Sequence, residues 1–500
     1  MCGIIGLYLK KPVVSELYEG LFMIQHRGQD QAGIYTFDDH KIHKRKGKGL
    51  VDDIFDYESL KRLKGNVGIG HVRYPTIGGG GAGDAQPFST DHPYGIMMAH
   101  NGNITNHHEL KKELIEKDLR FVNSDCDVEV ILKVFADGLR KQKLSANVTP
   151  ENIWKAVEEV FKRVLGAYSV VCHIAHQGMV VFRDPYGIRP AIWGTRKRDL
   201  IEEHCFCSEN VVLDYLGFDV KRDVRPGEVI FIDKNDKVHT KDVMPKKQHL
   251  CIFEYIYFAR PDAVIDQISV QKARYRMGQK LAPAIKKAGI KIDSVVPVPD
   301  SSRWAAIGLA KELGIDYREG LVKHRYVGRT FIMPGQNVRK KSIRRKFTPN
   351  IYELKNKNIL LVDDSIVRGN TSKKIINLVR ESGAKKVYMA SVAPPLTSPC
   401  PYGIDLASKK EYIANDFSIE DIRKNIGADA LFYQELDQLI EACAPEKHRN
   451  FEFCTACFNG KYPTSEMTEE KLQAMEKIRD VELCRVWDTE DESDSQLSLI

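Results

Sequence analysis

The sequence has no long hydrophobic run, and this absence excludes several classes of protein. No stretch approaches about 18 consecutive apolar residues, so we expect no membrane-spanning helix. The N-terminus has no basic segment followed by an apolar run and a cleavage site, so we expect no signal peptide. The net charge of +7 over 500 residues is modest, and there is no internal repeat. Eleven cysteines in a chain of this length favour reduced thiols over a disulfide framework, which predicts a soluble, cytoplasmic protein.

What is present is enough apolar sequence, 43% of the chain, to form the cores of two domains. Over residues 2–240, short β-type runs and Gly/Pro turns alternate with helical patterns, which predicts a sheet-and-helix domain. Over 250–465, strands alternate with helices, which predicts a parallel, doubly wound sheet. Residues 466–500 predict one more helix, over 469–479, and an acidic, disordered tail. The main predicted helices cover 107–117, 127–140, 153–165, 302–313 and 372–382, and the strands of the second domain 292–298, 358–362 and 386–393.

The second residue of the chain is a cysteine. Removal of Met1 is expected before a side chain as small as that of Cys2, and it would leave a thiol and a free α-amino group on one residue. An α-amine has an unperturbed pKa of about 8, so it can accept the thiol proton at neutral pH. Nucleophile and general base would then belong to the same residue. Taken alone, the pair Met1-Cys2 favours an ordinary cysteine behind an initiator methionine, and the rest of the chain reverses this.

Four further segments of the first half are dense in polar residues. Thiolysis of an amide needs, besides the sulfur, donors for the tetrahedral oxyanion and anchors for the charged ends of the substrate. The segments are His26–Gly33, His71–Thr76, His100–Ile104 and Ser124–Asp127. In this order behind Cys2, and followed by Arg183–Pro190 and Ser208-Glu209, they resemble the glutamine amidotransferase domain of the N-terminal-nucleophile class. Within the first segment, Gln31 stands where that class usually has a small residue.

The resemblance covers residues 2–235 and implies an αββα sandwich. It implies that Cys2 attacks the glutamine carboxamide and that Asn101 and Gly102 form the oxyanion hole. Arg73 would bind the substrate α-carboxylate, and Asp127 its α-ammonium. The chemistry of these side chains agrees, because arginine offers a bidentate fork to a carboxylate and aspartate offers a counter-charge to an ammonium.

In the second half, an apolar strand ends in two acids and continues into a loop that opens a helix. Paired acids at the carboxyl end of a strand can bind ribose hydroxyls, and the N–H groups of a helix N-terminus can bind a phosphate. The segment Asn358–Thr371 resembles the signature of the type I phosphoribosyltransferases, which bind phosphoribosyl pyrophosphate with magnesium. That family has the doubly wound sheet expected here. The resemblance implies that the sugar phosphate is bound by Asp363, Asp364, Ser365, Ile366, Val367, Arg368, Gly369, Asn370 and Thr371.

A second loop resembles another part of the same site. Pro297–Ser302 is similar to the loop that holds the pyrophosphate in these enzymes. The resemblance implies that Ser301 contributes, with Asp363 and Asp364, to a Mg²⁺ site.

A basic segment follows, and it has two interpretations. Nine of the residues in Lys323–Lys346 are Lys or Arg, so a surface that binds a polyanion such as a nucleic acid is one possibility. The apolar run Phe331-Ile332-Met333 favours the other, a closing loop, and Lys323–Gln336 resembles the mobile lid of the phosphoribosyltransferases. Arg329 would then bind phosphoribosyl pyrophosphate, and lid cations would neutralise the leaving pyrophosphate while water is excluded. We therefore expect no nucleic-acid partner.

Together, the two halves resemble the amidophosphoribosyltransferase family from Cys2 to about Thr464. The resemblance implies that glutamine is hydrolysed at Cys2 and that ammonia passes to phosphoribosyl pyrophosphate, giving 5-phosphoribosylamine, pyrophosphate and glutamate. It also implies the first committed step of purine nucleotide synthesis, a homo-oligomer (commonly a tetramer), and feedback inhibition by purine nucleotides. Three alternatives stay open: another N-terminal-nucleophile amidotransferase, a salvage phosphoribosyltransferase with an inert first domain, and a non-catalytic RNA-binding or regulatory protein.

Four cysteines of the second half stand in informative contexts. The two-residue spacing of Cys454 and Cys457 is by itself compatible with zinc, redox chemistry or chance. The contexts of these two and of Cys251 and Cys400 resemble those of the ligands of a 4Fe-4S cluster in one branch of the family, and four thiolates complete the protein ligands of such a cluster. The lid residues Ile332–Gly335 resemble the branch that has no cluster. The resemblance thus implies a 4Fe-4S cluster, with zinc or free thiols as alternatives.

Overall fold

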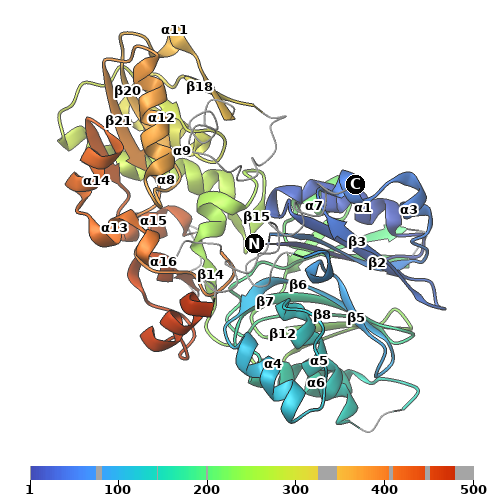
Figure 1. The fold of residues 1–500 in the computed structure, drawn as a ribbon. Coiled ribbons are helices and arrows are strands. Elements are labelled where there is room, and N and C mark those ends of the chain that lie inside the picture. The colour runs from blue at the N-terminus through green and yellow to red at the C-terminus, as the bar shows by residue number, and fades with distance from the viewer. Residues whose placement is uncertain are drawn as a thin grey trace, which may run out of the picture.

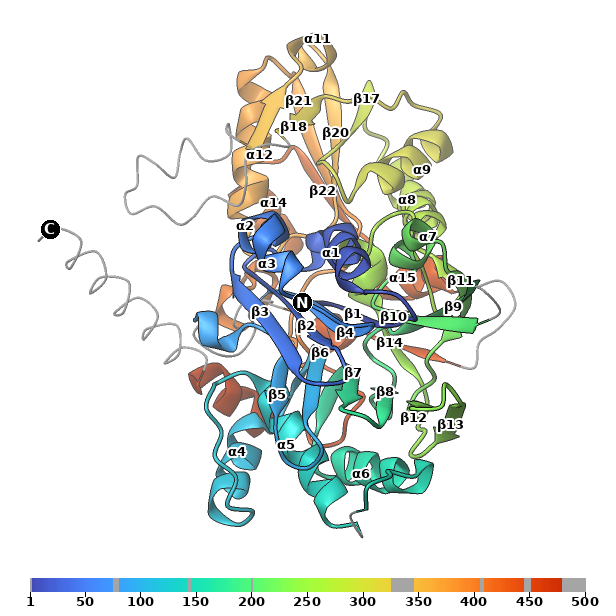
Figure 2. The same cartoon turned by 90° about the vertical axis from the view of Figure 1, so that its right-hand side faces the viewer.

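The computed structural model describes residues 2–74, 81–142, 145–198, 201–324, 346–404, 409–444 and 451–478. Within these ranges the chain forms a first domain with two sheets and a second domain built around one parallel sheet (Figures 1 and 2). The N-terminus lies where the two domains meet (Figure 1).

The first sheet has seven antiparallel strands, in the order β11-β9-β10-β1-β4-β2-β3. The central strand β1 is buried on both faces, which explains its continuous run of small and apolar residues. The strands are β1 (Gly3–Tyr8), β2 (Gln31–Phe37), β3 (Ile42–Lys48), β4 (Val67–Arg73), β9 (Ile192–Arg198), β10 (Ile201–Cys207) and β11 (Asp219–Asp223).

The second sheet packs against the first. It has six antiparallel strands, in the order β13-β12-β8-β7-β6-β5. Apolar side chains from both sheets, such as Ile4, Ile69, Met97 and Val181, fill the layer between them. The strands are β5 (Phe88–Thr90), β6 (Ile96–Ile104), β7 (Gly166–Ile174), β8 (Gly178–Arg183), β12 (Glu228–Asp233) and β13 (Val238–Asp242).

Helices cover the outer faces of both sheets (Figure 1). The first sheet carries α1 (Val14–Met23), α2 (Val51–Ile54), α3 (Tyr57–Lys61) and α7 (Val211–Leu216), and the second α4 (His107–Glu116), α5 (Asp127–Arg140) and α6 (Pro150–Arg163). Short 3₁₀ turns are η1 (Gln25–Arg27) and η2 (Ala82–Asp84). These four layers confirm the predicted αββα sandwich.

The second domain contains a parallel sheet in the order β17-β20-β21-β22. Alternate residues of β20 face opposite ways: Leu360 and Val362 pack with α8 and α9, whereas Ile359 and Leu361 pack with α12 and α14. Helices on both faces confirm the predicted doubly wound sheet. These elements are β17 (Ser294–Pro297), β20 (Asn358–Asp363), β21 (Lys386–Ser391), β22 (Ala430–Tyr433), α8 (Val270–Lys287), α9 (Arg303–Leu313), α12 (Asn370–Glu381) and α14 (Ile419–Ile426).

Shorter elements connect the two domains and complete the second. One apolar cluster contains Ile5 and Ile188 of the first domain together with Ile256 and Leu281 of the second, so the domains share part of a core. Residues 469–478 are helical, as predicted, and the expected tail beyond 478 lies outside the described residues. The elements are β14 (His249–Cys251), the π turn η3 (Glu254–Phe258), β15 (Val264–Ile265), β16 (Ile268–Ser269), β18 (Leu321–Lys323), β19 (Phe347–Pro349), α11 (Ile351–Leu354), η4 (Lys409–Glu411), α13 (Ile413–Asp416), α15 (Leu436–Cys443), β23 (Glu452–Cys454) and α16 (Ala456–Asn459).

Candidate functional sites

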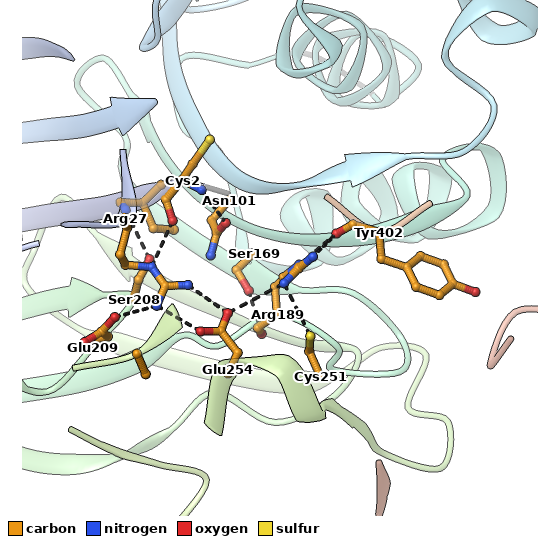
Figure 3. A network of polar contacts seen from close by, with 12 residues as sticks. Cys2, Arg27, Asn101, Ser169, Arg189, Ser208, Glu209, Cys251, Glu254 and Tyr402 are labelled. Atoms are coloured by element: carbon orange, nitrogen blue, oxygen red, sulfur yellow. Dashed lines mark hydrogen bonds and ion pairs between the residues drawn. The ribbon is translucent and has the colours of Figure 1, made fainter. Parts of the chain in front are cut away.

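Cys2 directly precedes the central strand of the first sheet. It is buried, and three contacts hold it: its nitrogen donates to Asn101 Oδ1 at 3.3 Å, its carbonyl accepts from Arg27 Nε at 3.0 Å, and its thiol donates to the Tyr74 carbonyl at 3.8 Å. The thiol and the carbonyl point in different directions (Figure 3). The backbone of Cys2 is thus fixed on one side while the sulfur projects to the other.

Asn101 and Gly102 lie on β6 of the facing sheet. Asn101 is fully buried, and its Nδ2 atom has no hydrogen-bond partner among the described residues. A buried donor without a partner is costly, so this amide is available to a ligand oxygen. Gly102 has φ +153°, and a Cβ there would lie 2.0 Å from the Ala167 carbonyl oxygen, so only glycine fits.

Arg73 ends β4 and is buried. Its Nη1 donates to Gln31 Oε1 at 2.9 Å and to the Asp84 carbonyl at 2.8 Å. Gln31 also donates from Nε2 to the Gly81 carbonyl at 2.8 Å, so it links the arginine to the segment after β4. The sequence showed that Gln31 was unusual, but not that it contacts the predicted carboxylate anchor.

Asp127 begins α5, on the same side as Asn101. Its Oδ2 accepts from His100 Nε2 at 3.2 Å and from the Ile104 amide at 3.3 Å. Burial alone would raise the pKa of Asp127, but the charge and hydrogen bond of His100 outweigh this and lower it to about 2. The carboxylate is therefore ionised at neutral pH. Asp127 therefore contacts His100, the neighbour in sequence of Asn101, and Asn101 contacts Cys2.

The motifs His26-Arg27 and Ser208-Glu209 have no individual role predicted from the sequence. In the structure Arg27 is fully buried, and Glu209 Oε1 lies 2.5 Å from Arg27 Nη1 and 2.8 Å from His26 Nε2. The Ser208 hydroxyl accepts from the Ile4 amide at 3.1 Å. These residues therefore hold the start of β1. The pairing of Arg27 with Glu209 could not be predicted from sequence spacing, because the two residues are 182 positions apart. Only their position in a motif indicated that they matter.

The second predicted site lies at the carboxyl end of β20. Ser301 Oγ donates to Asp364 Oδ2 at 2.5 Å, and Ser365 Oγ donates to Asp364 Oδ1 at 2.7 Å. Burial, and then the charge of Asp364, raise the pKa of Asp363, and burial also raises that of Asp364. The Ser301 and Ser365 hydroxyls thus converge on the Asp364 carboxylate, and the Asp363 carboxylate accepts from the Asp364 amide at 3.0 Å.

The loop behind these acids ends at Gly369, with φ +74°, where α12 begins. In the part of the chain that the structure describes, the backbone N–H groups of residues 366–369 donate to no protein acceptor. Unpaired amides at the start of a helix of 12 residues form a cradle for an anion. The predicted lid residue Arg329 lies outside the described residues, as does most of the basic segment.

The segments that carry the four predicted cluster ligands lie next to one another. Parallel pairing of β14 with β23 places Cys251 opposite Cys454. Cys457 lies on α16, and its carbonyl accepts from the Thr397 and Ser398 amides at 3.0 and 3.1 Å, just before Cys400. Burial and the charges of the other three thiols raise the pKa of Cys457. Across the described ranges, however, no group of three or more His, Cys, Asp or Glu side chains has the arrangement of a metal site.

A cation lies next to these cysteines. Arg189 is fully buried, and its Nη1 donates to Cys251 Sγ at 3.6 Å. Its Nε donates to the Tyr402 carbonyl at 2.8 Å (Figure 3). Strand β6, which carries Asn101, also contacts this region, because Asn103 Nδ2 donates to the Pro401 carbonyl at 2.8 Å. Neither contact could be predicted from the sequence.

None of the described helices is long and apolar enough to cross a membrane.

Comparison with known proteins agrees with both halves of this description. A model described as a glutamine amidotransferase domain matches residues 75–214, and one described as a phosphoribosyl transferase domain matches residues 264–428. Amidophosphoribosyltransferases of Pseudomonas aeruginosa and Escherichia coli are 49% and 47% identical over 483 and 489 residues, and each alignment covers 96% of both proteins. A solved glutamine phosphoribosylpyrophosphate (PRPP) amidotransferase from B. subtilis, complexed with ADP and GMP, is 36% identical with a TM-score of 0.82, over 94% of this chain and 98% of its own. The chain therefore belongs to the amidophosphoribosyltransferase family.

Proposed function

We infer that this protein is a glutamine-dependent amidophosphoribosyltransferase. It hydrolyses glutamine and transfers the ammonia to phosphoribosyl pyrophosphate, which yields 5-phosphoribosylamine, pyrophosphate and glutamate in the first committed step of purine nucleotide synthesis. One observation carries this inference. A buried cysteine beside an unpartnered amide donor occurs in the same chain as a loop of acids and free N–H groups at the edge of a parallel sheet.

For the first half-reaction, we propose that Cys2 is the nucleophile after removal of Met1. Its α-amine takes the thiol proton, and the sulfur attacks the glutamine carboxamide carbon. The electron pair that moves onto the oxygen is stabilised by Asn101 Nδ2 and the Gly102 amide. Collapse of this intermediate passes the proton to the leaving nitrogen and releases ammonia, and water then cleaves the thioester to glutamate. Arg73 and Asp127 bind the two charged ends of the substrate.

For the second half-reaction, the free N–H groups of residues 366–369 are proposed to bind the 5-phosphate, and Asp363 and Asp364 the ribose hydroxyls. Ammonia then attacks C1 with inversion, and pyrophosphate leaves with the bonding electron pair. The oxygen cluster of Ser301, Asp363 and Asp364 suits Mg²⁺, which prefers oxygen ligands. When bound, the ion would neutralise charge on the pyrophosphate.

We also propose that Cys251, Cys400, Cys454 and Cys457 hold a 4Fe-4S cluster. The pairing that places Cys251 opposite Cys454 and the buried Arg189 cation beside Cys251 support it, because four thiolates and a cluster would carry net negative charge. Such a cluster would join β14, β23 and α16 covalently. Protein purified without oxygen is expected to be brown and to contain iron and sulfide. A colourless, iron-free preparation would contradict the proposal, and stoichiometric zinc would replace it.

Further properties of the family extend the proposal. The chain is proposed to act in the cytoplasm as a homotetramer and to be inhibited by purine nucleotides. The B. subtilis relative, solved with ADP and GMP, supports the last point. The proposed domains are residues 2–240, 250–465 and the C-terminal segment 466–500.

The function is tested by the change Cys2→Ala. The variant is expected to lose glutamine-driven pyrophosphate release and to keep the ammonia-driven rate, because only the first half-reaction needs the thiol. Cys172→Ala is a matched control, since Cys172 is a buried cysteine of the same domain that lies on β7. Glutamine-driven activity that survives in Cys2→Ala would contradict the proposal, as would mass spectrometry that finds Met1 retained in the native protein.

A further inference from the structure

A series of buried polar contacts links Cys2 to the second domain (Figure 3). Arg27, whose Nε donates to the Cys2 carbonyl, donates from its two outer nitrogens to both oxygens of Glu254, at 3.0 and 2.8 Å. Arg189 Nη1 lies 3.6 Å from Glu254 Oε1. One carboxylate therefore lies between two guanidinium groups, and one of these groups holds the backbone of Cys2.

The acid and the arginines belong to different domains. Arg27 ends η1 and Arg189 precedes β9, both in the first domain, whereas Glu254 begins η3 in the second. The side chains of both arginines are 0% exposed and that of Glu254 is 2% exposed. Together with Glu209, which also pairs with Arg27, the cluster contains two positive and two negative side chains. A buried charge is tolerated only when it is paired closely, so the second domain supplies one acid that the first domain needs.

The turn that carries Glu254 is itself fixed by the second domain. Arg274 of α8 donates from Nε to the Tyr255 carbonyl and from Nη2 to the Ala259 carbonyl, both at 2.8 Å. The position of Glu254 is therefore fixed by helix α8 of the second domain.

We propose that Glu254 is a positioning residue for the glutaminase reaction, supplied to Cys2 by the phosphoribosyltransferase domain. It holds the Arg27 guanidinium so that Nε stays on the Cys2 carbonyl, and with the Asn101 contact on the nitrogen this fixes the orientation of Cys2. The inference rests on the proposed role of Cys2 as nucleophile. Glu254 touches neither substrate nor reacting atoms, so its effect is exerted through Arg27.

The test is Glu254→Gln, which keeps the shape of the side chain and removes its charge. Because a displacement of about 1 Å at a reacting group can cost about 100-fold in rate, we expect the glutamine-driven kcat to fall about 100-fold. The glutamine KM and the ammonia-driven rate should each stay within about threefold, since neither substrate site contains Glu254. Alkylation of Cys2 by a diazoketone analogue of glutamine should slow in parallel with the glutamine-driven rate.

Glu228→Gln is the matched control. Glu228 is also a fully buried acid between two arginines, Arg222 at 2.6 Å and Arg225 at 3.1 Å, but it lies on β12 away from Cys2. This control is expected to keep both rates. The proposal is overturned if Glu254→Gln retains its glutamine-driven rate, or if it loses the ammonia-driven rate equally.

If Glu254→Gln does not fold, Arg27→Lys decides the question. It keeps the buried charges balanced and lacks the Nε donor, so it should show the same selective loss of glutamine-driven kcat. Unchanged glutamine-driven activity in this variant would overturn the proposal. The assay of Cys2→Ala distinguishes an error in the assigned nucleophile from an error in the role of Glu254. If Cys2→Ala is active with glutamine, the assigned nucleophile is wrong. If Cys2→Ala is inactive with glutamine but Arg27→Lys is active, only the role of Glu254 fails.

Discussion

The two candidate sites of this protein are constructed in opposite ways. In the candidate glutamine site, Cys2 directly precedes one strand, Arg73 and Asn101 lie on two others and Asp127 begins a helix, and these elements are far apart in sequence. In the phosphoribosyl site, one continuous loop and helix start, residues 363–371, supplies the acids and the free N–H groups, and Ser301 joins from a second loop.

The difference shows what each site depends on. The loop site depends on the local backbone at the end of β20. The assembled site depends on the packing of two sheets and, through Arg27 and Glu254, on a second domain. Substitutions in the first site should therefore lower only the glutamine-driven rate, whereas substitutions in the second site should lower the glutamine-driven and ammonia-driven rates together.

The largest separation is expected from Asn101→Ala. Removal of one oxyanion donor typically costs about 100- to 1,000-fold in kcat, so the glutamine-driven rate should fall by that factor. The ammonia-driven rate should not change, because Asn101 belongs to the first site. The two rates are measured side by side as pyrophosphate release. A decrease of less than about tenfold in the glutamine-driven rate would show that Asn101 is not the main donor.

Asp363→Asn should lower both rates together. Hydrogen bonds to a charged group contribute about 1.5–3 kcal/mol each, so the loss of the ribose and magnesium contacts should cost roughly 100-fold with either nitrogen source. Alkylation of Cys2 by the diazoketone analogue should proceed as in the wild type, since the first site is intact. Unequal losses with glutamine and ammonia would show that the acid affects the distant site directly.

The smallest effect is expected from Gln31→Ala. The change removes the 2.9 Å contact that orients Arg73, so the glutamine KM should rise about tenfold while kcat stays nearly constant. Steady-state kinetics with varied glutamine measure this. An unchanged KM would mean that other contacts of Arg73, such as that with the Asp84 carbonyl, hold it in place.

The sequence was sufficient to predict the fold class of both domains. The predicted helices 127–140 and 372–382 correspond to α5 (Asp127–Arg140) and α12 (Asn370–Glu381), because their apolar positions repeat with helical spacing. The candidate loop site could also be proposed from the sequence, since its strand, acids and helix start follow one another along the chain.

The contacts around Cys2 could not be predicted from the sequence in the same way. Arg189 belongs to the segment Arg183–Pro190, and Glu254 follows Cys251 by three residues, yet nothing in their spacing shows that they meet. Pairs of buried charges that are tens to hundreds of positions apart follow no periodicity, and the π turn that presents Glu254 has no clear sequence pattern. The Gln31 contact with Arg73 was missed because the two residues lie opposite each other on the paired strands β2 and β4 but are 42 positions apart in the sequence.

The shared ion pairs have a consequence for how such an enzyme could be divided into subunits. The peptide connection between β13 and β14 is a natural place to split the gene. A polypeptide that ended there would retain Arg27 and Arg189 in its interior with Glu209 but without Glu254. A stand-alone glutaminase derived from this chain would have to acquire a replacement acid of its own, or else mature only when its partner polypeptide docks.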